Sequence, residues 1–382
     1  MTELKRTLNL LDAILFELGG MIGAGVFVIT GFAAARAGSD LFFSILITGA
    51  ASLLTALTYA ELSSAIPKEG GEYAFASEVS KPIGWLVGGG WVVADVLTAA
   101  TVTLGFAAYF NLARPTPFIS IIAILVLTLI SASGVKESAT VNNIITLLKI
   151  LALILFIFYA FTFNPVQQPA RTFNSINILA GAALMFFAFS GFGKISELAE
   201  EVKNPTETIP KAVIISMLTV IILYLLIAQA ALRLATPSQL SSTLTPLATT
   251  AQNPVIRNII IFGALLATLS VTLTLINGAS RILYAMSKKL GFLSKLSENG
   301  VPVNAVLIIS ASITLLTLFV RVNTVIKTAS LVLLLFYSTL NLALIYLKEK
   351  KKIKTKYSFF YPYTQIIAFL MTITLFLSFI FY

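Results

Sequence analysis

The sequence predicts an all-α integral membrane protein, and two observations carry this prediction. Of the 382 residues, 58% are hydrophobic and only 11% are charged, and the mean hydropathy is +0.94. A soluble domain carries about 25% charged residues, so this composition excludes one. The apolar runs are long and are bounded by turn residues, whereas the strands of a membrane β-barrel would be short and would alternate apolar with polar residues.

Eleven apolar runs along the chain are long enough to span a bilayer. About 20 apolar residues suffice for a helix to cross the hydrocarbon core. One membrane domain therefore takes up nearly the whole chain. Basic residues are concentrated in the loops on the side of the N-terminus, which predicts a cytoplasmic N-terminus and, after eleven spans, an external C-terminus. The expected spans are residues 10–37, 40–66, 82–112, 118–135, 140–163, 176–200, 209–234, 255–288, 301–320, 323–347 and 359–382.

The chain has no cysteine and no histidine. This composition excludes disulfides, thiol catalysis and the usual zinc and haem ligands. We therefore expect no enzyme activity, no catalytic residues, no metal site and no cofactor. Any proton carrier inside the membrane must be Asp, Glu, Lys or Tyr. The expected partners are the lipid bilayer and a small solute rather than nucleic acid, and the oligomeric state stays open.

Two of the expected spans are interrupted by glycine. The first contains Gly19–Gly25, with four glycines in seven residues, and the sixth contains Ser190–Gly193. Each glycine costs about 1 kcal/mol of helix propensity. Because these spans are five apart, two similar five-helix units would insert in opposite directions, as in inverted-repeat transporters with a site at the midplane. We expect a first repeat over residues 10–163, a second over 176–347 and an extra helix over 359–382. The alternative is that both stretches are close-packing glycine motifs between helices.

Several short motifs also resemble those of one transporter family. They are Gly23–Phe27, Tyr59–Leu62, Pro67–Tyr73, Phe187–Phe192, Glu200–Pro205, Ile209–Ala212, Gly278–Arg281 and Tyr284–Met286. In these motifs the chain resembles the amino acid permeases of the amino acid–polyamine–organocation (APC) superfamily, which have the LeuT-type fold. The resemblance covers roughly residues 8–347. It implies a LeuT-type 5+5 inverted repeat with broken helices 1 and 6, about eleven transmembrane helices and an amino acid substrate.

The chain departs from this family in two places. Many relatives carry an acidic residue just after the Gly-Phe pair of the sixth helix, where this chain has Gly193 and Lys194. Many relatives also have twelve spans.

The two interruptions predict a site for a zwitterion. The second half of a broken helix begins with unpaired N–H groups at its positive end, and the first half ends with unpaired carbonyls at its negative end. We expect the substrate carboxylate on the N–H groups near Gly23, and the ammonium on carbonyls of Ile22 and of the sixth span. The resemblance points to the same atoms. The expected substrate-binding residues are Ile22, Gly23, Ala24, Gly25, Phe187, Ala188, Phe189, Ser190 and Gly191.

Aromatic residues of the sixth span are candidates for a gate. Phe187, Phe189 and Phe192 would close over the substrate, with Phe187 as the occluding side chain. The alternative is that these rings only pack the core.

Four ionisable residues lie inside expected spans: Glu17, Asp95, Lys149 and Lys194. Each would cost on the order of 3 kcal/mol if it faced lipid, so each should face the interior and find a partner. We expect a Glu17–Lys194 pair at the inner gate, because both residues lie in the cytoplasmic halves of broken spans. Three roles stay open for Asp95: a partner of Lys149, a reader of a basic substrate group, or a structural carboxyl.

Lys149 continues a polar stripe with Asn143 and Thr146, at a three-residue spacing that faces the bundle. In the permeases that the chain resembles, a lysine at this place in the fifth helix marks members that need no sodium. Its ammonium stands where sodium-coupled relatives hold the ion. Desolvation favours the neutral form of a buried lysine. Proton uptake by Lys149 would join the first and eighth helices, and its loss would release them.

The ligands expected for the Lys149 ammonium come from two helices. The eighth would supply Ser270 and Thr274, and the first would supply a carbonyl of Gly19 or Gly20. Protons would then be the coupling ion, with no sodium. The alternative is a static cation that is never deprotonated.

These expectations add up to a secondary active amino acid transporter of the cell membrane that works by alternating access. Proton-coupled symport with Lys149 as the switch is the main reading, with neutral amino acids favoured as substrates. An amino acid exchanger on the same fold is one alternative, and an amino acid-binding sensor without transport is another. A channel is disfavoured, because the sequence shows no polar pore ring.

Overall fold

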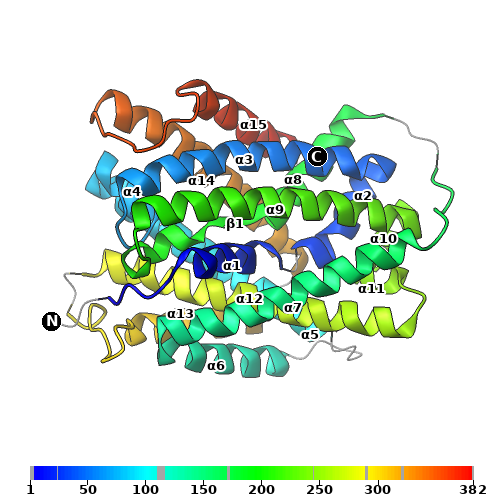
Figure 1. Cartoon of the computed structure of the whole chain (residues 1–382), viewed down its shortest axis with the longest axis horizontal. Coiled ribbons are helices and arrows are strands. Elements are labelled where there is room, and N and C mark those ends of the chain that lie inside the picture. Colours follow the sequence, from blue (N-terminus) through cyan, green and yellow to red (C-terminus); the bar gives the residue numbers. More distant parts are fainter. Residues whose placement is uncertain are drawn as a thin grey trace.

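The computed structural model describes residues 4–23, 25–109, 117–169, 173–243, 245–288, 291–319 and 322–380. These residues form a bundle of long helices that run mostly along one axis (Figure 1). Seven stretches are long and apolar enough to cross a membrane, and the first of them, Leu10–Ala65, holds two of the expected spans. Three shorter apolar helices cover Phe118–Ser133, Val303–Phe319 and Tyr363–Ser378. The predicted class, a helical membrane protein, is confirmed.

The first span is interrupted where the glycines predict. Helix α1 (Leu10–Met21) begins at a capping box, in which Asn9 and Asp12 each accept the other's backbone N–H. It ends before Ile22, and the chain resumes as the π-helical turn η1 (Gly25–Ile29) and helix α2 (Thr30–Ala37). A short turn, η2 (Gly38–Asp40), then leads into α3 (Leu41–Ala65).

The sixth span is interrupted in the same way. Helix α8 (Ser175–Phe189) gives way to the extended segment β1 (Ser190–Gly193) and then to the 3₁₀ segment η3 (Lys194–Glu201). Gly191 and Gly193 have φ values of 114° and 87°, in the left-handed region that favours glycine. A Cβ atom on Gly191 would lie 2.8 Å from the carbonyl oxygen of Gly20, so the two interruptions meet at close range.

The remaining helices follow the other expected spans, with short additions. Helices α4, α10 and α11 were not expected, and they lie at the two ends of the bundle, α4 at one end and the other two opposite (Figure 1). The bounds are α4 (Glu72–Val79), α5 (Lys81–Tyr109), α6 (Pro117–Ser133), α7 (Val135–Phe161), α9 (Pro205–Leu234), α10 (Pro237–Ser241), α11 (Pro246–Thr250), α12 (Pro254–Met286), α13 (Val303–Phe319), α14 (Val322–Glu349) and α15 (Tyr363–Ile380).

Contacts between helices recur in pairs, and a shift of five spans along the chain relates the two contacts of each pair. Helix α1 packs on α7, and α8 packs on α14. Helix α3 packs on α8, and α9 packs on α1. Helix α12 packs on α7, and α5 packs on α14. The two interrupted spans therefore each contact both halves of the chain.

Large apolar side chains remain exposed on the outer helices. Leu129 of α6, Phe158 of α7 and Ile222 of α9 are 72%, 69% and 60% exposed. A soluble protein rarely leaves extended apolar surface uncovered, whereas a lipid-facing surface is apolar by nature. Glu17, Asp95, Lys149 and Lys194, the four ionisable residues expected inside the spans, are all buried in the bundle.

Candidate functional site

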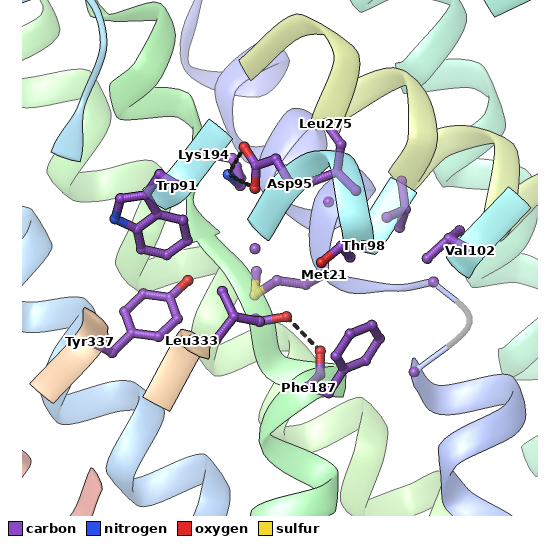
Figure 2. A pocket seen from close by; sticks show the side chains of 16 residues that line it. Met21, Trp91, Asp95, Thr98, Val102, Phe187, Lys194, Leu275, Leu333 and Tyr337 are labelled. Carbon is purple, nitrogen blue, oxygen red and sulfur yellow. Dashed lines mark hydrogen bonds and ion pairs between the residues drawn. The ribbon is translucent and has the colours of Figure 1, made fainter. Parts of the chain in front are cut away.

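A small cavity of about 30 Å³ lies between the two interruptions (Figure 2). It is lined by α1, the segment after it, α5, α8, β1, η3, α12 and α14. Its walls combine apolar side chains with one charged pair. The lining residues are Gly20, Met21, Gly23, Gly25, Trp91, Asp95, Thr98, Val102, Phe187, Ser190, Gly191, Lys194, Val271, Leu275, Leu333 and Tyr337.

The structure brings together five of the predicted substrate-binding residues. Gly23, Gly25, Phe187, Ser190 and Gly191 all line the cavity. Three others, Ile22, Ala188 and Phe189, are buried but do not line it. Ala24 lies outside the described residues.

Glycine is required at two of these positions by close approach. A Cβ atom on Gly25 would lie 2.5 Å from the Cα of Ala188, and one on Gly23 would overlap the Val271 side chain. The two glycines let the start of the second half of the first span lie directly against α8 and α12.

The carbonyls predicted for the substrate ammonium already have donors. Ile22 accepts from Lys149 at 2.6 Å, and Phe187 accepts from the Ser190 hydroxyl at 2.6 Å. Ala188 accepts from the Tyr224 hydroxyl at 3.1 Å. Only the Phe187 carbonyl belongs to a residue of the cavity wall. The prediction that the Ile22 carbonyl receives the substrate ammonium is wrong, because this carbonyl accepts from Lys149 and Ile22 does not line the cavity.

The three candidate gate aromatics have different surroundings. Phe187 lines the cavity, as a gate requires. Phe189 packs against Tyr224, with ring centroids 5.0 Å apart. Phe192 is stacked on Tyr337 at 4.5 Å and is 1% exposed. Phe189 and Phe192 thus lie in the core, which was the alternative for these rings.

Tyr224 of α9 links the two interruptions, and sequence reasoning missed it. Its hydroxyl lies 2.9 Å from the Met21 carbonyl and 3.1 Å from the Ala188 carbonyl. Both carbonyls belong to the last turns of broken helices, which lack intrahelical partners. The sequence signal was a lone tyrosine in an otherwise apolar helix.

Lys149 of α7 reaches the end of α1 from the side opposite the cavity. Its ammonium donates to the carbonyls of Gly19 at 2.9 Å and Ile22 at 2.6 Å, and to the Ser270 hydroxyl at 3.1 Å. The side chain is fully buried. Lys149 therefore connects α1 and α12.

Two of the ligands expected for Lys149 are wrong. Gly20 and Thr274 do not contact it; Thr274 instead donates to the Ser270 carbonyl at 3.0 Å. The geometry of a helix end explains the difference. Carbonyls three residues apart, such as those of Gly19 and Ile22, lie on one face, whereas that of Gly20 is rotated away.

The polar groups around Lys149 are neutral. Ser270 donates to Asn142 at 2.8 Å, and Asn142 donates to the Leu15 carbonyl at 3.1 Å. The sequence predicted that Asn143 belongs to the polar stripe that faces the bundle. In the structure Asn143 donates to Asp12 at the periphery, and Asn142 lies next to Ser270 instead. Within the described ranges, no Asp or Glu forms an ion pair with Lys149.

The predicted Glu17–Lys194 pair is wrong. The Lys194 ammonium lies 2.7 Å from both carboxylate oxygens of Asp95 and 2.6 Å from Glu197 (Figure 2). It also lies 5.1 Å from the centre of the Trp91 ring. Asp95 thus pairs with Lys194 rather than with Lys149. The side chain of Lys194 passes close to Gly20 of α1 and reaches Asp95 of α5 on the cavity side.

Glu17 has a different partner in the same segment. Its carboxylate accepts the N–H groups of Gly193 at 2.9 Å and Ile195 at 3.0 Å. These N–H groups belong to the first turn of η3, where a helical segment has unpaired donors that favour an anion. Many relatives were expected to carry an acid just after the Gly-Phe pair, where this chain has Gly193 and Lys194. In this structure the carboxylate of Glu17, from the first span, contacts this segment.

A layer of contacts covers the cavity on the α4 side of the bundle. The Arg281 guanidinium bonds to Glu201 at 3.1 Å, with both side chains buried. The backbone of Leu8 pairs with Val202, with Lys203 N–H donating to the Leu8 carbonyl at 2.8 Å.

The loop before α4 belongs to this layer. Glu69 and Glu200 each accept the other's backbone N–H, at 3.3 Å and 3.0 Å. Burial raises the pKa of Glu69, and the neighbouring Glu201 carboxylate raises it further. Next to this loop lies a larger opening of about 670 Å³. Its charged lining residues are Lys68, Glu69, Glu78, Lys81, Glu200 and Lys288.

A helical membrane bundle with two broken spans around an enclosed cavity is the architecture of a solute transporter. Comparison with known proteins agrees. A family model described as "amino acid permease" matches residues 8–382. The chain is 30% identical over 315 residues to the branched-chain amino acid permease BcaP of Bacillus subtilis, covering 75% of this chain and 68% of that one.

Other relatives carry other names. The methylthioribose transporter of Bacillus subtilis is 31% identical over 319 residues, with 75% of this chain and 68% of that protein covered. Cationic amino acid transporter 7, chloroplastic, of Arabidopsis thaliana is 31% identical over 258 residues, with 59% and 44% covered. The chain belongs to the amino acid permease family of the APC superfamily. It is a multi-pass membrane permease and not an enzyme, as expected.

Proposed function

We propose that this chain is a secondary active amino acid transporter of the cell membrane, built on a 5+5 inverted repeat and working by alternating access. Family membership supports the substrate class. The matched helix contacts support the repeat, because an inverted repeat requires each contact within one half to recur in the other. The cytoplasmic N-terminus is part of this proposal and rests on the distribution of basic residues.

The substrate carboxylate binds at the start of the second half of the first span, near Gly23 and Gly25. The absence of side chains at these glycines leaves backbone N–H groups accessible from the cavity. The ammonium binds on the opposite wall, at the Phe187 carbonyl and the Ser190 hydroxyl. A carbonyl oxygen has two lone pairs, so the Phe187 carbonyl can accept from both Ser190 and the substrate.

The substrate side chain is neutral. It meets Val102, Val271 and Leu275, which are apolar lining residues. Asp95 and Lys194 also line the cavity, but they neutralise one another at 2.7 Å. A substrate with a charged side chain would have to break this pair.

Proton coupling runs through Lys149. The observation that carries this proposal is the set of three ligands around the buried Lys149 ammonium: the carbonyl of Gly19 in α1, the carbonyl of Ile22 just after α1 and the hydroxyl of Ser270 in α12. In the part of the chain that the structure describes, this ammonium has no carboxylate partner. Desolvation makes such a charge costly, so the lysine can be discharged when access changes. Loss of the proton removes the charge and one of the three N–H donors, which weakens the hydrogen bonds to the Gly19 and Ile22 carbonyls and frees α1 to move against α12. No sodium ion is needed, because the ammonium fills the place between the helices.

The test is uptake of labelled neutral amino acids into proteoliposomes with and without a proton gradient. We expect gradient-driven uptake that does not depend on sodium, and its loss in Lys149→Ala. Lys211→Ala is the matched control, because Lys211 is 53% exposed at the start of α9. If Lys149→Ala keeps both uptake and its pH dependence, the switch is excluded.

The same assay separates the alternatives. An exchanger takes up label only when the vesicles contain substrate, whereas a symporter fills empty vesicles. A sensor binds the amino acid and moves none in either case.

A further inference from the structure

Three buried carboxyl groups surround one buried ammonium next to the cavity. Asp95, Glu72 and Glu197 are 2%, 1% and 0% exposed, and the Lys194 side chain is 3% exposed. If all four groups were ionised, the cluster would carry an excess of two negative charges in a region without water-facing surface. Burying an uncompensated charge costs several kcal/mol.

The three carboxyl groups share Lys194 unequally. Asp95 takes two contacts with the ammonium at 2.7 Å, and Glu197 takes one at 2.6 Å. Glu72 has no ion-pair contact with it. It accepts a hydrogen bond at 2.7 Å from the hydroxyl of Tyr59, which is neutral. Glu72 is therefore the least compensated of the three.

One oxygen of Glu72 has no partner in the part of the chain that the structure describes. The atom is Oε2, and it is fully buried. Oε2 of Glu197 is also buried without a partner there, but the other oxygen of Glu197 contacts the Lys194 ammonium, whereas Glu72 has no cation contact. A buried carboxylate oxygen accepts hydrogen bonds in nearly all proteins, so an oxygen without a donor is informative. Protonation of the carboxyl group removes one negative charge from the cluster and turns one of its oxygens from an acceptor into an O–H donor.

The other charged groups around Glu72 do not compensate it. Glu17 of α1 is turned to the N–H groups of Gly193 and Ile195. Arg281 of α12, the next buried cation, is bonded to Glu201 at 3.1 Å. Tyr337 of α14 is neutral and stacked on Phe192.

We propose that Glu72 is a proton-binding site: its carboxyl group is protonated while the loop before α4 is packed against η3, and this proton stabilises the closed arrangement. The inference goes beyond the proposed function, because the Lys149 switch does not require it. Independent support comes from burial, which raises the pKa of the Glu72 carboxyl; Lys194 and the Tyr59 hydrogen bond lower it to a smaller degree.

This site communicates with the cavity through Lys194. The same ammonium that lines the cavity lies within electrostatic range of Glu72. Ionisation of Glu72 would add a third carboxylate that attracts the Lys194 ammonium. The contact between Lys194 and Asp95 would become weaker. The contact between η3 and α5 would loosen as a result. Proton occupancy of Glu72 therefore controls the charged wall of the cavity.

Infrared difference spectroscopy of the purified protein tests the proposal without transport. At neutral pH, the wild type minus Glu72→Gln spectrum is expected to show the C=O stretch of a protonated carboxyl group, shifted in D₂O. Glu78→Gln is the matched control on the same helix, because Glu78 is 39% exposed and paired with Lys68 at 2.6 Å. Its difference spectrum is expected to show only an ionised carboxylate.

Two outcomes would overturn the assignment. One is a Glu72→Gln difference spectrum with the bands of an ionised carboxylate and none of a protonated one. The other is a protonated-carboxyl band that disappears in Glu197→Gln and stays in Glu72→Gln. A failure of amino acid uptake, by contrast, bears on the proposed function and leaves the infrared result intact.

The pH dependence of thermal unfolding provides a second measurement. A native carboxyl group with a raised pKa makes the folded state bind more protons than the unfolded state, so stability falls as pH rises above the ordinary value of 4.5. Glu72→Gln removes this loss of stability at high pH. The melting temperature of the variant is therefore expected to exceed that of the wild type at alkaline pH and to be close to it at acidic pH. An equal loss of melting temperature at every pH would contradict the proposal.

Discussion

At the scale of single residues, the buried charges of this permease are neutralised in two different ways. Lys149 is held by dipoles alone, two carbonyls and a hydroxyl. Lys194 is held by carboxylates, with Asp95 and Glu197 in direct contact. A cation held by neutral dipoles gives up its proton more readily than one held by anions. The two lysines are therefore suited to different tasks, Lys149 to switching and Lys194 to holding η3 against α5.

We expect substitutions of Asp95 and Lys194 to be strongly coupled in their effects on the free energy of unfolding. Asp95→Asn leaves the ammonium with one carboxylate less, and removal of one partner from a buried pair costs about 3–5 kcal/mol. Lys194→Met should destabilise the fold as well, by leaving Asp95 unpaired. The double variant still leaves Glu197 without its cation, so it is expected to be more stable than Lys194→Met and to lose less than the sum of the two single losses. Thermal unfolding in detergent measures all three, and strictly additive losses would show that the pair is not coupled.

We expect a smaller loss of stability from a substitution of Ser270, which contacts the other buried lysine, Lys149. Ser270→Ala removes one ligand of Lys149 and the donor to Asn142, both of them buried. Loss of a partner from a buried polar group costs about 1–3 kcal/mol. We expect a lower melting temperature and weaker proton-driven uptake. Ser312→Ala on α13 is the control, because Ser312 is half-buried and donates to the Ile308 carbonyl of its own helix; a similar loss there would make the Ser270 result uninformative.

At the scale of elements, the close approach of η1 to α8 depends on one glycine. A Cβ atom on Gly25 would lie 2.5 Å from Ala188 Cα, which is backbone and cannot rotate away. Gly25→Ala is expected to push the two broken spans apart, to cost about 1–3 kcal/mol by overpacking and to reduce uptake. Gly89→Ala in α5 meets nothing within 4 Å and should be neutral. Equal stability of the two variants would refute the close packing.

The docking of the loop before α4 onto η3 depends on pH. Burial and the adjacent Glu201 raise the pKa of Glu69, so the folded state holds its proton to higher pH than the unfolded state does. Stability from this group is present at acidic pH and is lost as pH rises above the ordinary value of 4.5. Glu69→Gln is expected to flatten the alkaline side of the stability profile. Melting curves across pH check this, and an unchanged profile would argue against a protonated Glu69.

At the scale of the whole molecule, the structure is closed on the side of α4. The segment before α1 pairs with the residue after η3, and Arg281 of α12 is tied to Glu201. The proposed mechanism of alternating access would require these contacts to open in each cycle. The absence of natural cysteines allows a direct test.

A disulfide between Leu8→Cys and Val202→Cys should lock this side. The two residues are paired in a parallel bridge, which brings their backbones close. Oxidation of the double variant is expected to abolish uptake, and a reductant should restore it. Each single cysteine variant is the control and should be insensitive to oxidant. Undiminished uptake by the fully crosslinked protein would mean that these segments do not separate during transport.

Much of the architecture could be predicted from the sequence, because it depends on local patterns. The helices follow the apolar runs, and both interruptions fall at the glycines Gly19–Gly25 and Gly191 and Gly193. Lys149 and Ser270 were placed together because their helical spacing put each on an inward face. Helices α4, α10 and α11 were missed, since they lie in loops whose short polar stretches carry little periodicity.

The pairing of charges could not be predicted. The sequence placed Glu17 and Lys194 in the same half of the bundle, but a side chain can leave its helix in several directions. The rotation of η3 turned Lys194 toward α5, while its first N–H groups faced α1 and took Glu17. Asn142 rather than Asn143 reached Ser270 for the same reason. One residue along a helix changes direction by about 100°.

The sequence by itself therefore determined the membrane class, the spans, the two breaks and the identity of the buried charges, because hydropathy, glycine content and charge are properties of the chain. Only the tertiary structure decided which groups meet: Asp95 with Lys194, Glu17 with the start of η3, Tyr224 with both broken helices, and Glu72 with a single neutral donor. These contacts join residues far apart in sequence, and their geometry depends on how helices rotate and pack. The proton site proposed at Glu72 belongs to this second group.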